Sequence, residues 1–239
     1  MTKLVNQDFK VLIIGAGPSG CIAGALLKNK GYRVTILERQ LFPRFSIGES
    51  LLPQCMEFIK QAGMLEAVIN EGFQFKNGAS FVRRDQHTEF SFENKFGEGV
   101  GTTFQVQRGR FDQVLANEAI RLGVDIQWQM EVIDTNLTIA KPEITARTIT
   151  EEIIIYQADF VLDASGFGRI LPKLLNLELP SSFPVRQALF CHIEDKIDTD
   201  SIESYFDFNS VLLSVIIGFV FIFILIIAIN LVRTIVRYF

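Results

Sequence analysis

The chain has 239 residues and a formal net charge of −4. This acidic balance argues against a nucleic-acid partner. Three cysteines and two histidines without ligand spacing argue against both a disulfide framework and a metal site. The length allows one large domain or two small ones.

A strand, a glycine-rich turn, a helix and a second strand open the chain. The apolar run Val11–Ile14 leads directly into the turn Gly15–Gly20, which has the pattern Gly-x-Gly-x-x-Gly. A helix as far as Lys30 follows, and a second apolar run, Arg33–Leu37, ends on Glu38. This order of elements is typical of a dinucleotide site. The alternative is a glycine-rich turn in an ordinary α/β domain.

The residue types of this segment suit a dinucleotide. Gly15 permits the tight turn, Gly17 lets a pyrophosphate approach the backbone, and Gly20 lets the helix lie close to the strand. The helix N-terminus offers free N–H groups and a partial positive charge to phosphates. Glu38 is placed to accept hydrogen bonds from a ribose.

The middle of the chain predicts an α/β domain with a mostly parallel sheet. Ser50 is a candidate cap for a helix that ends at Gly63, and a short helix follows it. Phenylalanines at alternating positions predict an inserted β-ribbon at about residues 73–106. Further elements are expected as a helix at 108–122, a strand at 124–128, a β-meander at 131–156 that turns at Lys141-Pro142, a strand at 158–162 and a helix at 171–175.

Four segments, in this order, resemble one family. They are the glycine-rich turn with Glu38, the loop Phe42–Pro53, the stretch Val106–Asp112 and the segment Asp163–Gly166. With these residues the chain resembles the flavin-dependent monooxygenases of the p-hydroxybenzoate hydroxylase superfamily. Within that superfamily it is similar to the FAD-dependent halogenases and the geranylgeranyl-reductase-like oxidoreductases. The resemblance covers roughly residues 8–193, and it implies FAD as the cofactor.

The resemblance also implies roles for single residues. Arg44 and Ser50 would lie along the phosphates or the flavin, Arg108 would reach the cofactor from the start of its helix, and Asp163 with Gly166 would line the far side. The alternatives are a solvated surface charge for each arginine and a turn or helix cap for Asp163. The complete implied set is Gly15, Gly17, Pro18, Ser19, Gly20, Glu38, Arg39, Arg44, Ser50, Arg108, Asp163 and Gly166.

Lys76 is the catalytic candidate, because halogenases carry an active-site lysine in the segment that it resembles. A lysine in an apolar pocket has a lowered pKa and can hold or capture hypohalous acid. Phe73, Phe75 and Phe81 are expected to supply that pocket. The alternative is a solvent-facing lysine beside a strand turn.

The chain departs from the family after about residue 193. A Trp-x-Trp signature and a later Gly-Asp segment are not found, and Gln187–Glu194 looks like the first strand of a missing sheet. We therefore expect an incomplete FAD-binding domain over 1–185 and a substrate-domain remnant with a linker over 186–207.

The last part of the chain predicts one transmembrane helix over 208–232 and a short tail over 233–239. Val211–Ile229 is almost entirely apolar and would be roughly 28 Å long as a helix, close to the ~30 Å of a bilayer core. Arg233 and Arg237 favour a cytoplasmic C-terminus, which would place the FAD domain on the opposite side of the membrane. Free cysteines and the lack of a signal-peptide pattern favour a membrane protein whose FAD domain is cytoplasmic. A buried helix and a frameshifted tail are the alternatives.

These features predict an FAD-dependent oxidoreductase of monooxygenase or halogenase type. It would use reduced flavin and oxygen on a small organic substrate, with a flavin reductase or NAD(P)H as the source of electrons. The alternatives are a non-catalytic, membrane-tethered FAD-binding remnant and a reductase of isoprenoids or lipids.

Overall fold

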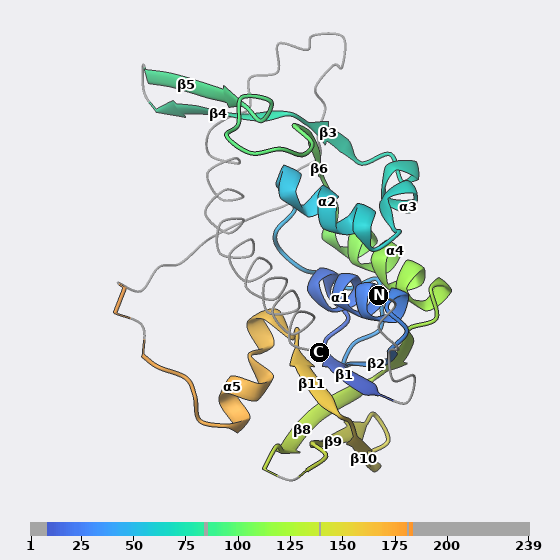
Figure 1. Cartoon of the computed structure of the whole chain (residues 1–239). Coiled ribbons are helices and arrows are strands. Elements are labelled where there is room, and N and C mark those ends of the chain that lie inside the picture. Colours follow the sequence, from blue (N-terminus) through green and yellow to red (C-terminus); the bar gives the residue numbers. More distant parts are fainter. Residues whose placement is uncertain (1–8, 84–85, 139, 181, 184–239) are drawn as a thin grey trace.

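A parallel four-stranded sheet forms the centre of the molecule, in the order β11-β1-β2-β7 (Figure 1). The computed structural model describes residues 9–83, 86–138, 140–180 and 182–183. All three strand pairs are parallel, which confirms the predicted α/β class. The strands are β1 (Lys10–Ile14), β2 (Arg33–Glu38), β7 (Asp125–Trp128) and β11 (Phe160–Asp163).

Helices cover one face of this sheet. Val11 and Ile13 point to this face and join a core with the helices, and the buried side chains of the first helix face them. Because Leu12 and Ile14 are buried on the opposite face, β1 reads as an unbroken apolar run, as expected of a strand covered on both sides. These helices are α1 (Pro18–Asn29), α2 (Pro53–Gln61), α3 (Leu65–Asn70) and α4 (Arg108–Arg121), whereas α5 (Ile170–Leu174) lies on the opposite face.

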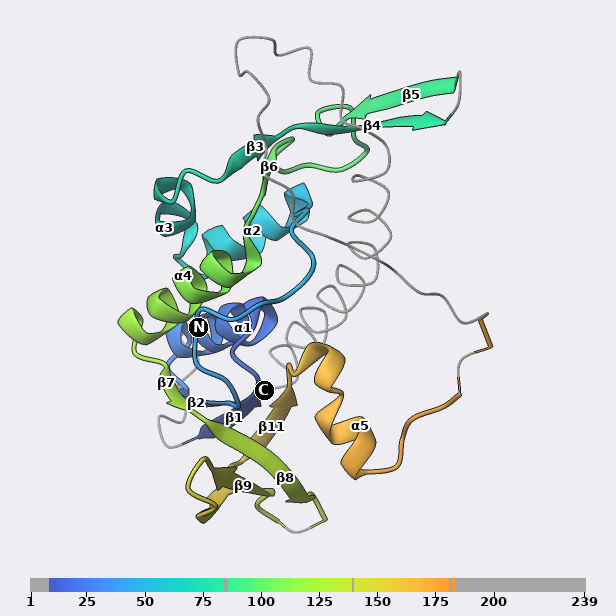
Figure 2. The same cartoon turned by 180° about the vertical axis from the view of Figure 1, so that it is seen from behind.

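A three-stranded antiparallel meander covers the other face, together with α5 (Figure 2). It consists of β8 (Met130–Asn136), β9 (Glu143–Thr148) and β10 (Ile153–Gln157). Met130 and Ile144 pack against Leu37 of the central sheet. The meander and its turn between β8 and β9 confirm the sequence prediction.

The predicted insertion has two parts. The short strands β3 (Gln74–Lys76) and β6 (Thr103–Gln105) pair antiparallel and lie next to α2. The hairpin of β4 (Gly78–Arg83) and β5 (Gln86–Ser91) projects away from the sheet and helices (Figures 1 and 2).

One helix cap was predicted wrongly. Ser50 does not cap α2, whose N-cap is Leu52 and whose first residue is Pro53. Ser50 instead forms an isolated antiparallel bridge with Gln105, at the end of β6. Proline fits the first helical position because its missing N–H would have no partner there, so the helix begins without a side-chain cap.

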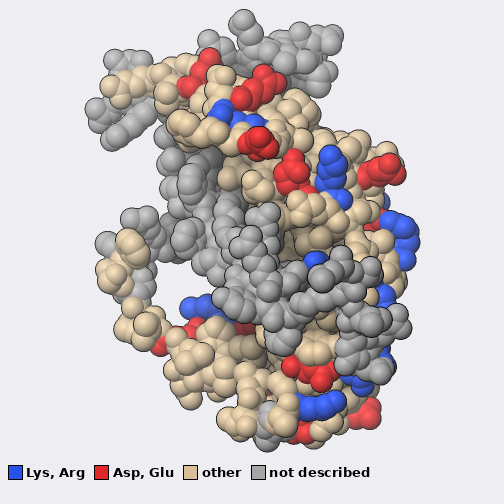
Figure 3. Space-filling view, viewed as in Figure 1, with Lys and Arg blue, Asp and Glu red and all other residues tan. Residues whose placement is uncertain are grey.

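Basic and acidic side chains are intermixed on the face shown in Figure 3. On α4, Arg110 pairs with Glu71 at 2.6 Å and Arg121 pairs with Glu118 at 2.8 Å. Both arginines are more than half exposed, and exposed pairs of this kind contribute little to the stability of a fold.

The predicted C-terminal elements lie outside the described residues. This holds for the substrate-domain remnant at 186–207, the membrane span at 208–232 and the tail at 233–239. Within the described part of the chain, no helix combines the length and the apolar character that crossing a membrane requires.

Candidate cofactor site

A cavity of about 500 Å³ lies at the carboxyl ends of β1, β2 and β11. Open α/β sheets bind their ligands at this edge. Most of the residues that the sequence assigned to the cofactor line it, whereas Gly20 and Asp163 do not, and neither does the catalytic candidate Lys76. Those that line it are Gly15, Gly17, Pro18, Ser19, Glu38, Arg39, Arg44, Ser50, Arg108 and Gly166.

The glycine-rich turn has the close contacts that its sequence predicts. Gly15 has a φ of +97°, and a Cβ on it would lie 2.8 Å from the Ala164 carbonyl oxygen. A Cβ on Gly20 would lie only 1.9 Å from the Gly15 carbonyl oxygen, so the helix could not approach the turn with any other residue there. Gly17 is different, because a Cβ on it would meet nothing closer than the Arg44 Nη2 at 3.6 Å. Its missing side chain opens space towards the cavity.

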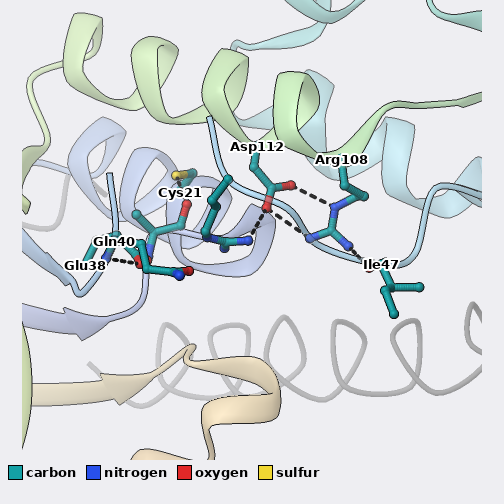
Figure 4. Close-up of polar contacts among 8 residues, drawn as sticks. Cys21, Glu38, Gln40, Ile47, Arg108 and Asp112 are labelled. Atoms are coloured by element: carbon teal, nitrogen blue, oxygen red, sulfur yellow. Dashed lines mark hydrogen bonds and ion pairs between the residues drawn. The ribbon is translucent and has the colours of Figure 1, made fainter. Parts of the chain in front are cut away.

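Glu38 holds this turn in place. Its carboxylate accepts hydrogen bonds from the N–H of Ala16 at 2.8 Å and of Gln40 at 2.9 Å, and only 6% of the residue is exposed (Figure 4). Each carboxylate oxygen has a second lone pair, and the residue borders the cavity. The ribose contact stays a prediction, to which the structure adds a role in shaping the turn.

Two arginines share one buried carboxylate at the other end of the cavity (Figure 4). Asp112 is fully buried, and it accepts hydrogen bonds from Arg108 Nε at 2.8 Å and Nη2 at 3.1 Å. Arg44 Nη1 lies 3.3 Å from the same carboxylate. Arg108 is 5% exposed, so the alternative of a solvated surface charge is wrong for it. Asp112 was not among the predicted site residues, although its spacing of four from Arg108 on a predicted helix was a signal.

Asp163 acts on the backbone and does not line the cavity. Its two oxygens accept hydrogen bonds from the N–H of Ser165 and of Leu171, both at 2.8 Å. Asp163 thus holds the turn after β11, in line with the alternative of a turn residue, and its contact with the cofactor stays a prediction. Gly166 does line the cavity, and Asp163 fixes the loop that carries it.

Lys76 lies beside the cavity and is connected to it through Ser50. Its Nζ donates hydrogen bonds to the Ser50 hydroxyl and to the Leu51 carbonyl, the latter at 3.4 Å. It also lies 5.2 Å from the centre of the Phe92 ring. Burial lowers the pKa of Lys76 from its usual 10.5. The lysine is half-buried, so the alternative of a solvent-facing side chain is wrong.

The aromatic pocket predicted around Lys76 is made of different residues. Phe75 is 60% exposed, because neighbouring residues of a strand point to opposite faces. Phe73 packs edge-on against Phe111 in the helical core, and Phe81 stacks on Phe90 in the hairpin. The ring that Lys76 contacts belongs to Phe92, which the prediction had not included.

Cys21 lies near the cavity but is chemically inert. Burial, with the carboxylates of Asp112 and Glu38 as smaller causes, raises the pKa of its thiol well above the usual value. The thiol donates a hydrogen bond to the Ala16 carbonyl at 3.0 Å. A protonated and buried thiol is a poor nucleophile.

A helix N-terminus, an open glycine and a guanidinium facing one cavity are the features of a domain that binds a dinucleotide phosphate. The chain belongs to the FAD binding domain family, whose family model matches residues 8–214. FAD is therefore the cofactor that this cavity serves, and the residues around it fit an anionic pyrophosphate.

Similar proteins include several flavin-dependent enzymes. A 1H-pyrrole-2-carbonyl-[peptidyl-carrier protein] chlorinase of Pseudomonas fluorescens is 28% identical over 72% of this chain and 42% of its own length. A tryptophan 2-halogenase of Chondromyces crocatus is 33% identical over 66% of this chain and 30% of its own. A crystal structure of a flavoprotein/dehydrogenase from Cytophaga hutchinsonii is 45% identical, with a TM-score of 0.71 over 73% of this chain and 44% of that one.

These similarities confirm the resemblance on which the cofactor prediction was based. The resemblance covers only part of these relatives, because the chain spans less than half the length of each of these three proteins.

Proposed function

We propose that the chain forms the FAD-binding part of an oxidoreductase of monooxygenase or halogenase type. The observation that carries the halogenase assignment is the hydrogen bond from Lys76 to Ser50, because Ser50 borders the FAD cavity. The amine is held next to the cofactor site by the inserted strands β3 and β6, which are not part of the parallel sheet. The substrate is a small organic molecule.

The contacts assign a different role to each residue of the site. Bound FAD, once reduced by a flavin reductase or NAD(P)H, would activate molecular oxygen, and the activated oxygen would be the oxidant for the halide. The glycine-rich turn and Arg44 bind the phosphates, and Glu38 binds the ribose. Lys76 holds the oxidised halide through a hydrogen bond from its nitrogen, and Phe92 shields one side of that nitrogen from water.

The test uses the full chain in mild detergent. Bound FAD is measured by its absorbance, and halide oxidation is followed with a flavin reductase, NADH, bromide and an electron-rich phenol. We expect brominated phenol from the unaltered chain, and normal FAD binding but no product from Lys76→Ala. Lys60→Ala, at an exposed position of α2, is the matched control and retains activity.

Other outcomes select the alternatives. Turnover that needs no halide, or that survives Lys76→Ala, contradicts the halogenase proposal. A chain that binds no FAD is a non-catalytic remnant. An FAD-dependent dehydrogenase or reductase, including one for isoprenoids or lipids, is the second candidate, because the structure with 45% identity is described as a flavoprotein/dehydrogenase. This candidate predicts turnover without oxygen, in which a dehydrogenase passes two electrons from the substrate to FAD and a reductase passes two electrons from reduced FAD to the substrate.

We also propose that residues 208–232 anchor the protein in a membrane, with the FAD domain on the cytoplasmic side. The support is the apolar composition of Val211–Ile229 and its bilayer-matching length. Alkaline carbonate extraction of a membrane fraction tests the anchor, and protease protection of sealed vesicles tests the orientation. Release of the full chain by carbonate contradicts the proposal.

A further inference from the structure

Asp112 is the one fully buried carboxylate among the described residues, and it lies between two arginines of the FAD cavity. Arg108 reaches it from one turn earlier on α4 and donates through Nε and Nη2. Arg44 reaches it from the loop after β2, with Nη1 at 3.3 Å. A buried carboxylate is stable only with such partners, so the three side chains form one unit.

The two arginines are held differently. Arg108 also donates through Nη1 to the Ile47 carbonyl, so Nε, Nη1 and Nη2 all have partners within the protein. Arg44 uses Nη1 for Asp112, whereas its Nη2 lies beside Gly17 at the N-terminus of α1. Arg108 therefore balances the charge of Asp112, and Arg44 brings a net positive charge to the phosphate end of the cavity.

We propose that Asp112 is a positioning residue for the cofactor, which directs Nη2 of Arg44 towards the phosphates of FAD. The ring of Phe42, 4.6 Å from the Arg44 guanidinium carbon, supports the same orientation. Phe42 itself packs on Trp128. The proposal rests on the FAD-binding part of the proposed function and is independent of halogenase chemistry.

Positioning and simple electrostatics predict opposite effects of removing this carboxylate. Asp112→Asn deletes a negative charge beside an anionic ligand, so electrostatics alone predicts tighter binding. If Asp112 orients Arg44, the variant binds phosphates more weakly despite its extra positive charge. We expect a roughly tenfold rise in the ADP dissociation constant, which corresponds to losing one charge-assisted hydrogen bond.

The experiment measures ADP and adenosine binding to the full chain by titration calorimetry, with folding checked by circular dichroism. Adenosine carries no phosphate, so its affinity stays within about twofold of the parent if Asp112 acts only through Arg44. A double-mutant cycle adds a second readout: Asp112→Asn combined with Arg44→Lys loses no more ADP affinity than Arg44→Lys alone. Glu71→Gln, which breaks the exposed Arg110 pair of the same helix, is the matched control and leaves ADP affinity unchanged.

The outcomes separate this proposal from the proposed function. Tighter ADP binding by Asp112→Asn overturns the positioning role of Asp112, and so does a loss of adenosine affinity as large as the loss of ADP affinity. Failure of this variant to fold overturns it too. Additive losses of ADP affinity in the double-mutant cycle with Arg44→Lys have the same meaning. Absence of ADP binding to the unaltered chain overturns it together with the FAD site. ADP binding with the expected pattern but without halide-dependent turnover leaves it intact and overturns only the halogenase assignment.

Discussion

Lys76 on β3 donates a hydrogen bond to the hydroxyl of Ser50, a residue that borders the FAD cavity. The two residues are 26 positions apart. Ser50 is also bridged through its backbone to Gln105 at the end of β6. The insertion is thus joined to the cofactor cavity through a side chain and through the backbone, which fixes the amine relative to the flavoprotein core.

Replacing Ser50 by alanine removes an acceptor of the Lys76 ammonium. Because this acceptor favours the charged form, we expect the pKa of Lys76 to fall further below its usual value. Lys76 then reacts with an amine-acylating reagent at lower pH, as followed by peptide mass spectrometry. The exposed Lys60 is the internal reference, and an unchanged or raised midpoint for Lys76 contradicts the expectation.

The lowered pKa of Lys76 also predicts a pH dependence of stability. Between this lowered pKa and the usual 10.5, the unfolded chain binds more protons than the folded one. The cost of burying the ammonium is therefore fully present below the lowered pKa and is relieved as the pH rises towards 10.5. Relative to Lys76→Met, the parent should gain thermal stability as the pH is raised over this range. If Lys76→Met instead gains thermal stability relative to the parent as the pH rises, the expectation is contradicted.

Glu38→Gln should destabilise the fold by about 1–3 kcal/mol, the cost of leaving a buried donor without an acceptor. The amide has one oxygen, whereas Ala16 and Gln40 each donate an N–H to a different carboxylate oxygen. Thermal denaturation measures the effect. Asp134→Asn, which alters an exposed hydrogen bond to the Thr135 N–H, should change stability far less. Equal effects of the two changes would refute this role for Glu38.

The glycines of the turn should separate folding from binding. Gly20→Ala places a Cβ 1.9 Å from the Gly15 carbonyl oxygen, so we expect a loss on the order of 3 kcal/mol. Gly17→Ala meets nothing closer than 3.6 Å and should cost about 1 kcal/mol or less, yet weaken ADP binding because the methyl group enters the cavity. Denaturation and calorimetry on both variants test this, and the reverse pattern contradicts it.

Asp163→Asn should loosen the loop at the far side of the cavity. One of the two N–H donors, from Ser165 or Leu171, loses its carboxylate acceptor. We expect a destabilisation of about 1–2 kcal/mol and faster hydrogen exchange at the start of α5. If α5 exchanges at the parent rate, Asp163 does not hold it.

The fold was predictable wherever a residue pattern has a single structural reading. The unbroken apolar run of β1 and the glycine pattern after it define a buried parallel strand and its turn. Ser50 shows the limit of such reasoning. A serine before an apolar helical pattern suggests a cap, but Pro53 suits the first helical position and the backbone of Ser50 pairs with Gln105. That pairing joins distant parts of the chain, and no local pattern reveals it.

The site was predictable where a residue touches the cavity directly, as Arg44 and Arg108 do. It was less predictable where a residue acts through another one. Asp112 and Asp163 are both carboxylates within the family segments, and only the folded contacts show that each holds protein groups in place. Phe92 was missed because β5 ends before it, so strand alternation does not determine where its ring lies.

The pairing of β1 with β11 has a consequence for how the protein folds. The backbone N–H of Lys10 donates a hydrogen bond to the carboxylate of Asp159, 149 positions away. The backbone of Ala164 packs closely against Gly15. The glycine-rich turn can form early during synthesis, but its cavity stays open on one side until β11 has left the ribosome. Contacts of such high sequence separation form late and slowly. FAD can therefore stabilise the domain only after most of the described chain has been made, and cofactor supply acts on the final folding step.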